Sequence, residues 1–206
     1  VQMEYLQEKF AKKGLMILYT APWPGQGFYT KFPVNSVSDF KGKKLRIYST
    51  ATQQMGSMLG FNATILPFAE IPQAFSTGLI EALFTSPQTG IDIQAWDNTK
   101  HFTYAGAIFS KNAVVVTKKA FNALSKGDQS NMLAAAKKAE LRGWEMSAET
   151  TKKQIDILKK NGMSSKNAPD EVISKMKSIG LEMMKNWRSK ASPEANAVLD
   201  RYLSMR

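Results

Sequence analysis

Cysteine is absent from this 206-residue sequence, and histidine occurs once, as His101. Without cysteine the chain can form no disulfide, no thiolate zinc site, no iron–sulfur cluster and no thiol nucleophile. A single histidine excludes any site built from several histidines, and the neighbours Lys100 and Phe102 mark His101 as an ordinary surface or loop residue. Most metal and nucleophilic chemistry is thereby excluded, and we expect no cofactor.

Long apolar runs are missing as well. The densest one, around Ala113 to Val116, is bounded by Lys111 and Lys118, whereas a membrane-spanning helix needs about 20 apolar residues. The sequence does not begin with Met and has no basic segment followed by an apolar stretch, so we expect any export signal to have been removed or to lie outside this sequence. With 43% hydrophobic and 22% charged residues, the chain is typical of globular proteins with one large or two small domains.

Positive charge is in excess, with a formal net charge of +11. The excess is uneven: residues 1–50 carry +5 and residues 151–206 carry +6, whereas residues 51–116 carry −2. The lysines at 152–153 and 159–160 have helical spacing and indicate a solvated helix face. Because no nucleic-acid-binding motif accompanies them, we expect no nucleic-acid partner.

The first thirty residues alternate between helical and extended patterns. Met3, Leu6 and Phe10 predict a helix over Val1 to Lys13 that Gly14 ends. Leu15 to Tyr19 is short and apolar, which predicts a strand buried on both faces of a parallel sheet. The stretch from Ala21 to Tyr29 is rich in proline and glycine and predicts a loop at the strand end, where α/β proteins place ligands.

The next segment predicts three strands separated by two helices. The strands are expected at 44–49, 63–66 and 80–84, and the helices at 55–59 and 69–77. This order is typical of parallel strands joined by right-handed crossovers in one sheet.

The second half of the sequence is mainly helical in pattern. A strand is expected at 113–117, and Ser125 and Asp128 have the character of helix caps. From Asp128 to Asn161 the apolar spacing indicates one helix of about 50 Å, long enough to cross two lobes. Two more helices are expected, over 169–187 and from Ser192 onward.

Aromatic residues fall in two groups. Trp144 and Trp187 lie on helical apolar stripes and are expected in the core. Trp23, Phe28 and Tyr29 either line a ligand pocket or pack in the core, and composition favours the core.

Arg46 is the strongest candidate for a functional residue. It lies in a predicted strand between Leu45 and Ile47, which are expected to be buried. A buried guanidinium needs an anion, and its planar donors match a carboxylate in a two-pronged hydrogen bond. From spacing alone, an edge-strand arginine that is exposed or paired with an aspartate is an equally good interpretation.

Several segments resemble the periplasmic solute-binding proteins of TRAP transporters, the DctP-like family. The most characteristic stretch runs from Pro33 to Ile47, PVNSVSDFKGKKLRI. Gly60 and the segments 66–71, 74–82 and 118–124 follow in family order, so that the resemblance covers nearly the whole chain.

The resemblance implies an α/β fold of the type II periplasmic-binding-protein kind, in which two lobes close around an organic acid and a long helix crosses both. It implies that Arg46 forms the salt bridge to the ligand carboxylate and that Phe68 is the pocket phenylalanine. Thr85 and Ser86 stand where many members carry a ligand-binding asparagine, so a hydroxyl is expected to replace that hydrogen bond. Gln26 stands where members that bind sialic acid carry a second arginine, which implies a ligand contact for Gln26 and argues against sialic acid as the substrate.

The same resemblance implies the ligand, the partner and the compartment. With one fixed charge and Trp23, Phe28, Phe68 and Trp96 expected nearby, we expect a small organic acid, an aromatic or branched monocarboxylate, as ligand. The expected partners are the membrane subunits of a TRAP permease, and the expected location is the periplasm.

Family members carry a long N-terminal part before the helix that matches Val1 to Lys13, and this sequence lacks it. We therefore expect an incomplete first lobe. The expected division assigns residues 1–22 to a remnant of the first lobe and 23–110 to the second lobe. Residues 111–150 return to the first lobe with the start of the long helix, and residues 151–206 continue that helix and dock the C-terminal helices on the second lobe.

Two alternatives of a different class remain. One is an enzyme on a related two-lobed α/β scaffold that acts on a small carboxylate with Glu70 or Asp92 as base, although no catalytic motif supports it. The other is nonspecific binding of anionic polymers by the basic helices, whose affinity would fall steeply with salt.

Overall fold

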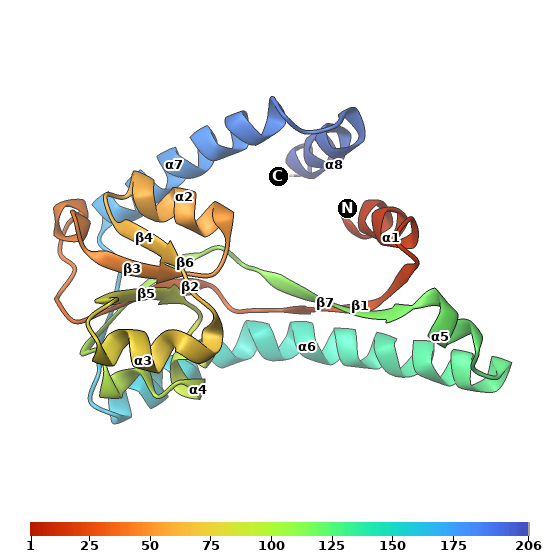
Figure 1. The fold of residues 1–206 in the computed structure, drawn as a ribbon, viewed down its shortest axis with the longest axis horizontal. Helices are drawn as coiled ribbons and strands as arrows, with labels where there is room; N and C mark the ends of the chain where they lie inside the picture. The colour runs from red at the N-terminus through yellow and green to blue at the C-terminus, as the bar shows by residue number, and fades with distance from the viewer. Residues whose placement is uncertain (206) are drawn as a thin grey trace. The chain divides into compact units, whose positions relative to one another are not determined.

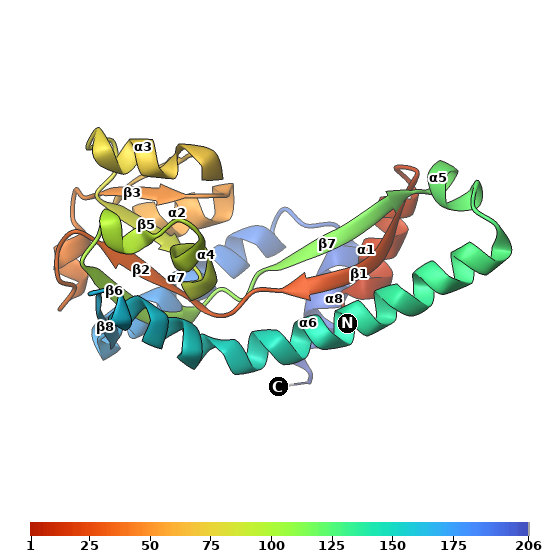
Figure 2. The same ribbon diagram turned by 90° about the horizontal axis from the view of Figure 1, so that it is seen from below.

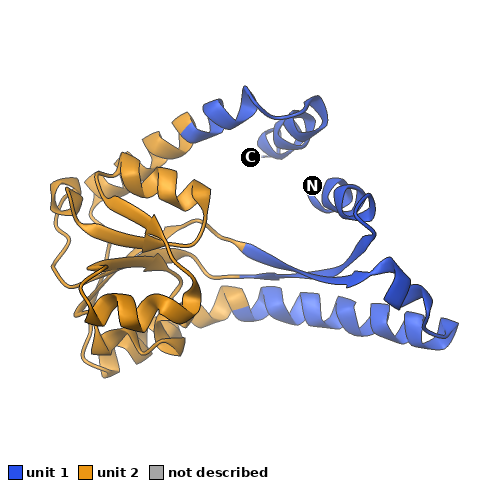
Figure 3. Cartoon of the chain, in the orientation of Figure 1, with its two compact units in different colours: residues 1–22, 111–146, 183–206 blue, residues 23–110, 147–182 orange. Residues whose placement is uncertain are grey.

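A computed structural model describes residues 1–205 of the chain (Figure 1). The chain divides into two units (Figure 3). Unit 1 consists of Val1–Pro22, Lys111–Met146 and Met183–Arg206, and unit 2 of Trp23–Ser110 and Ser147–Glu182. The chain thus passes from one unit to the other several times, twice within long helices.

Unit 2 contains a mixed six-stranded sheet with the strand order β4-β3-β5-β2-β6-β8. Strand β3 is parallel to β4 and β5, β2 is antiparallel to β5 and β6, and β6 is parallel to β8. The strands are β2 (Gln26–Thr30), β3 (Lys44–Ile47), β4 (Asn62–Ile65), β5 (Ala82–Thr85), β6 (His101–Ala107) and β8 (Ser164–Asn167).

The predicted strand–helix–strand–helix–strand segment is confirmed as three neighbouring parallel strands in this sheet. The helices that connect them are α2 (Thr50–Met58) and α3 (Ile71–Ser76). Shorter elements complete the unit: η1 (Val37–Phe40), η2 (Phe68–Glu70), α4 (Pro87–Asp92) and η3 (Ala95–Asp97).

The prediction of a loop over Ala21 to Tyr29 is wrong from Gln26 onward, where the chain forms strand β2. All five of its residues are buried, and Phe28 packs against Phe40 and Phe84, each with its ring centroid 4.8 Å away. Gly27 permits this central strand, because a Cβ atom there would lie 2.5 Å from the carbonyl oxygen of Thr103 on β6. The aromatics of this segment, Phe28 and Tyr29, therefore belong to the core and do not line a pocket.

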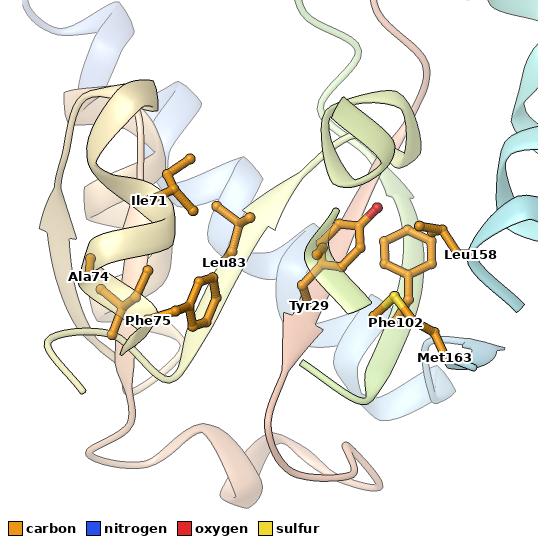
Figure 4. Close-up of a cluster of buried hydrophobic side chains, with 10 residues drawn as sticks. Tyr29, Ile71, Ala74, Phe75, Leu83, Phe102, Leu158 and Met163 are labelled. Carbon is orange, nitrogen blue, oxygen red and sulfur yellow. The ribbon is translucent and has the colours of Figure 1, made fainter. Parts of the chain in front are cut away.

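The main apolar cluster of unit 2 joins the sheet to the helices beside it (Figure 4). Tyr29, Leu83 and Phe102 from β2, β5 and β6 form its centre, with the rings of Tyr29 and Phe102 4.4 Å apart. Ile71, Ala74 and Phe75 of α3 cover one end of the cluster, and Leu158 and Met163 cover the other. Each fully buried side chain of this size stabilises the fold by about 1.5–3 kcal/mol.

Unit 1 is built on a two-stranded antiparallel ribbon, whose strands lie side by side in Figures 1 and 2. Its strands are β1 (Leu15–Pro22) and β7 (Lys111–Thr117). The strand predicted at Leu15 to Tyr19 is therefore present but is antiparallel and mostly half-buried, because β1 pairs with β7 alone. The backbone N–H and the hydroxyl of Thr20 donate to Glu140 at 2.9 and 2.7 Å, which ties β1 to the long helix.

Helices make up the remainder of the chain. They are α1 (Met3–Ala11), α5 (Lys118–Asn122), α6 (Lys126–Lys160), α7 (Asp170–Arg188) and α8 (Pro193–Leu203). The predicted long helix is confirmed as α6, with 35 residues. Ser125 precedes it as predicted for a cap, with its hydroxyl accepting from the N–H of Asp128 at 3.1 Å. No helix within residues 1–205 is both long enough and apolar enough to cross a membrane.

The prediction that Trp144 and Trp187 are core residues is wrong for the described chain. Their side chains are 51% and 48% exposed. Trp187 lines a shallow pocket with Leu6 of α1 and Leu199 of α8, which covers only part of its surface.

The C-terminal residues 183–206 group with unit 1, where α8 packs against α1. The expected division into two lobes is a separate prediction that these units do not test. The assignment of the two units to lobes of a whole receptor stays a prediction.

The close packing around Tyr29 gives a test of the fold. An alanine at Gly90, in α4, would place its Cβ atom against the ring and hydroxyl of Tyr29, which is fully buried. We expect Gly90→Ala to lower the free energy of unfolding by about 2–3 kcal/mol. Gly180→Ala, in the open middle of α7, is the matched control and should raise it by about 0.5–1 kcal/mol. Urea unfolding followed by circular dichroism measures both, and equal effects would contradict the packing described.

Candidate functional site

The predicted site residues converge on one edge of the sheet in unit 2. Strands β3, β4 and β5 are parallel, so their carboxyl ends meet at this edge. Strand β2 begins there, because it is antiparallel to β5 and pairs Gly27 with Thr85. The edge therefore carries Gln26, Arg46, Phe68, Thr85 and Ser86. Open α/β sheets bind ligands at the carboxyl ends of their strands.

Arg46 is a buried cation without a carboxylate partner. It is 4% exposed, its Nε donates to the carbonyl oxygen of Leu66 at 3.0 Å, and its Cζ lies 5.9 Å from the centre of the Tyr48 ring. Burial lowers the pKa of Arg46 below its ordinary value. Within residues 1–205 no carboxylate forms an ion pair with it and no acceptor bonds its terminal Nη atoms. The site can therefore take an anion.

Gln26 and Tyr48 form a hydrogen-bond network beside Arg46. The Tyr48 hydroxyl lies 2.8 Å from Nε2 and 3.0 Å from Oε1 of Gln26. The Nε2 atom of Gln26 also donates to the carbonyl oxygen of Ile108 at 3.0 Å and to the hydroxyl of Ser110 at 3.3 Å. Gln26 itself is 2% exposed. Its polar atoms are therefore all engaged by protein groups.

Ile108 contributes its carbonyl from a strained backbone. Its φ is 53°, the left-handed region that a β-branched residue rarely adopts, at a cost of about 1–2 kcal/mol. Besides Gln26, the N–H of Ser110 donates to this carbonyl at 3.1 Å. Two hydrogen bonds to one oxygen help to offset the strain.

Thr85 and Ser86 are buried at the end of β5. The hydroxyl of Ser86 accepts from the N–H of Thr89 at 3.2 Å, as the N-cap of α4, and its carbonyl accepts from the Tyr29 hydroxyl at 3.2 Å. Ser86 thus has a structural role in addition to the ligand contact expected of it. The ligand contacts of Thr85 and Ser86 stay predictions.

Two aromatic residues flank the edge. Phe68 lies in η2, two residues beyond the Leu66 carbonyl that Arg46 contacts, and is 53% exposed. Trp23 is half-buried, and its backbone N–H donates to the carbonyl oxygen of Ser110 at 2.8 Å. Trp96, by contrast, packs against the core cluster around Tyr29.

Neither residue named for the enzyme alternative forms an ion pair with Arg46 in the described chain. Glu70 and Asp92 are both exposed, and the Asp92 carboxylate accepts from Gln88 at 2.7 Å. In the part of the chain that the structure describes, no group of three or more histidines or acidic residues is placed to hold a metal ion.

Sequence reasoning missed Tyr48, Ile108 and Ser110. Tyr48 was recognised only as a strand residue, although its position two residues after Arg46 was a usable signal. Ile108 and Ser110 lie more than 80 residues from Gln26 along the chain, and nothing in the local pattern links them.

Comparison with known proteins identifies the family. The model of the bacterial extracellular solute-binding proteins of family 7, DctP, matches residues 1–190. The chain belongs to this family. A solute-binding protein of Chromohalobacter salexigens is 25% identical over 160 residues, which are 74% of this chain and 47% of that relative.

Solved structures of the family are similar throughout the chain. An extracytoplasmic solute receptor of Bordetella pertussis that binds pyroglutamic acid is 39% identical, with a TM-score of 0.93 over 97% of this chain and 66% of that one. A pyroglutamate-specific TRAP solute-binding protein from a marine metagenome is 32% identical, with a TM-score of 0.91 over 98% of this chain and 66% of that one. The predicted family and the predicted two-lobed α/β receptor fold with its long helix are confirmed. The chain spans just under two thirds of these structures and about half of the curated relative.

One buried and two half-buried tyrosines give a pH prediction for unit 2. Burial raises the pKa of Tyr48 and Tyr104 above their ordinary value of 10 and that of Tyr29 well above it. A raised pKa means that the folded state holds these protons more tightly than the unfolded state, so the free energy of unfolding should fall as pH rises above 10. Absorbance titration of the six tyrosines should show at least three that ionise late, and one fewer in Tyr48→Phe. Ionisation of all six together near pH 10 would contradict this.

Proposed function

We propose that the protein is an extracytoplasmic solute receptor that binds a small organic acid through Arg46 and delivers it to the membrane subunits of a TRAP permease, without chemical change. The observation that carries this proposal is the buried Arg46 side chain with no carboxylate partner among the described residues. A buried cation is costly unless it is paired, and a ligand carboxylate supplies the missing anion. Family membership supports the same role and a periplasmic location.

The geometry favours one mode of binding. The Nε atom of Arg46 is occupied by the Leu66 carbonyl, which leaves the two terminal Nη atoms for the ligand. We propose that the carboxylate meets both of them end-on, in a bidentate salt bridge that fixes its orientation as well as its charge.

Pyroglutamate is the ligand that we propose. Three solved receptors that are 39%, 35% and 32% identical to this chain bind it. It is a monocarboxylate with a neutral lactam ring, which suits a site whose cation has the neutral side chains of Gln26, Tyr48 and Ser110 beside it. In place of the expected aromatic or branched body, the compact ring would lie against Phe68 and Trp23.

Substitution of Arg46 tests the site. In the full natural polypeptide that contains this sequence, Arg46→Ala should weaken pyroglutamate binding about 100-fold or more, because one partner of a buried charge pair is lost. Arg46→Lys keeps the charge but not the two-pronged geometry and should weaken it about tenfold. Lys44→Ala, at the other end of β3, removes an exposed cation and should change affinity less than twofold. Titration calorimetry measures all three, and unchanged binding by Arg46→Ala would refute the assignment.

Native mass spectrometry of the purified natural polypeptide tests the ligand class. Beside a denatured spectrum that gives the chain mass, the native spectrum should show a bound species with the mass of pyroglutamic acid. Competition should then give the highest affinity for pyroglutamate, a lower affinity for aromatic monocarboxylates and the lowest for aliphatic dicarboxylates. The second carboxylate of a dicarboxylate would meet no described cation in the proposed site. Preference for a dicarboxylate would contradict the proposed ligand class, and catalytic turnover of the bound acid would favour the enzyme alternative.

A further inference from the structure

We infer that Gln26 and Tyr48 are positioning residues that fix the orientation of the Arg46 guanidinium and thereby set carboxylate affinity without touching the ligand. The inference rests on the proposed function for its binding readout. It assigns Gln26 a different role from the ligand contact that the family resemblance implies.

The carboxamide nitrogen of Gln26 has no N–H group free for a ligand. Its nitrogen donates to the Tyr48 hydroxyl, the Ile108 carbonyl and the Ser110 hydroxyl, and its oxygen lies within hydrogen-bond distance of the same Tyr48 hydroxyl. An amide nitrogen has only two N–H groups, so these partners already exceed its capacity. With 2% of its surface exposed, Gln26 acts inside the protein.

Tyr48 carries the effect of this network to Arg46. The Cζ atom of Arg46 lies 5.9 Å from the centre of the Tyr48 ring, within the range of a cation–π interaction. The Leu66 carbonyl fixes the Nε end of the same side chain. The hydroxyl bonds to Gln26 fix the ring plane, and a fixed ring limits rotation of the guanidinium about its remaining torsions. The Leu66 carbonyl after β4 and the Tyr48 ring after β3 thus together favour one orientation of the Arg46 guanidinium.

The backbone anchors the network at its far end. Gln26 bonds the carbonyl of Ile108, whose left-handed conformation is also held by the N–H of Ser110. The carbonyl of Ser110 in turn accepts from the N–H of Trp23. One of the partners of the Gln26 amide nitrogen is thus a main-chain carbonyl, whose position is set by the backbone.

Deletion of the Tyr48 hydroxyl tests this role. Tyr48→Phe keeps the ring and removes the bonds that fix it, and we expect pyroglutamate affinity to fall about tenfold in the full natural polypeptide. Tyr104→Phe is the matched control: it removes another half-buried hydroxyl of unit 2, one bonded to Thr151, and should change affinity less than twofold. Gln26→Leu, which keeps the side-chain volume, should resemble Tyr48→Phe.

A double-mutant cycle separates positioning from general destabilisation. If Tyr48 acts through the orientation of Arg46, then Arg46→Lys should cost about tenfold in the natural background but only about twofold in Tyr48→Phe, because the oriented two-pronged geometry is already lost. Equal costs in both backgrounds would overturn the inference even if Arg46→Ala abolishes binding as the proposed function requires.

The Nε–H signal of Arg46 gives a readout that needs no ligand. In a ¹⁵N-correlated NMR spectrum it is identified by its absence in Arg46→Lys. The bond to Leu66 should protect this proton from exchange with solvent, and Tyr48→Phe and Gln26→Leu should each speed its exchange about tenfold, whereas Tyr104→Phe should not. Unchanged exchange in both variants would overturn the inference whether or not the protein binds pyroglutamate.

Discussion

The buried guanidinium of Arg46 is the feature on which the rest of the candidate site depends. Removing a cation from water is unfavourable by several kcal/mol unless an anion or strong acceptors replace the lost hydration. The described chain supplies one carbonyl, from Leu66, and one aromatic face, from Tyr48. This partial compensation leaves the guanidinium able to attract an external anion, and this is the physical basis of the proposed salt bridge to a ligand carboxylate.

The sheet holds Arg46 in this unfavourable place through its neighbours. Leu45 and Ile47 are fully buried on either side of it, and a slip of β3 by one residue would move both to the opposite face of the sheet and turn Arg46 into their apolar surroundings. Strand β2 reaches the same edge because Gly27 lets it pass close to β6. The packing of the apolar core is therefore what brings Gln26 beside Tyr48, and the polar network exists because the core places it there.

The sequence predicts features that depend on neighbouring residues and fails for features that depend on contacts between distant segments. The apolar neighbours of Arg46 are local and predict its burial, but its functional role is favoured over that of an exposed arginine only by the family resemblance. The long helix α6 is predicted because its apolar spacing repeats over 35 residues. The proline and glycine residues around β2 predict a loop. The burial of this strand depends on β5 and β6, which lie far along the chain. The exposure of Trp144 and the bonds of Gln26 to Ile108 and Ser110 also depend on distant segments, which no local pattern reports.

The neutral side chains beside Arg46 bear on how many charges a ligand of the proposed site can carry. A charged side chain at the deeply buried position 26 would need an oppositely charged partner. The residue present there, Gln26, is neutral, and its amide bonds a main-chain carbonyl and two hydroxyl groups. Among the described residues, the side chains that contact or surround Arg46 in this network are neutral. In the proposed site a second carboxylate would lose its hydration without a described cation to replace it, whereas a neutral lactam has less hydration to lose. The proposed preference for a cyclic monocarboxylate thus depends on the neutrality of these described neighbours as well as on the charge of Arg46.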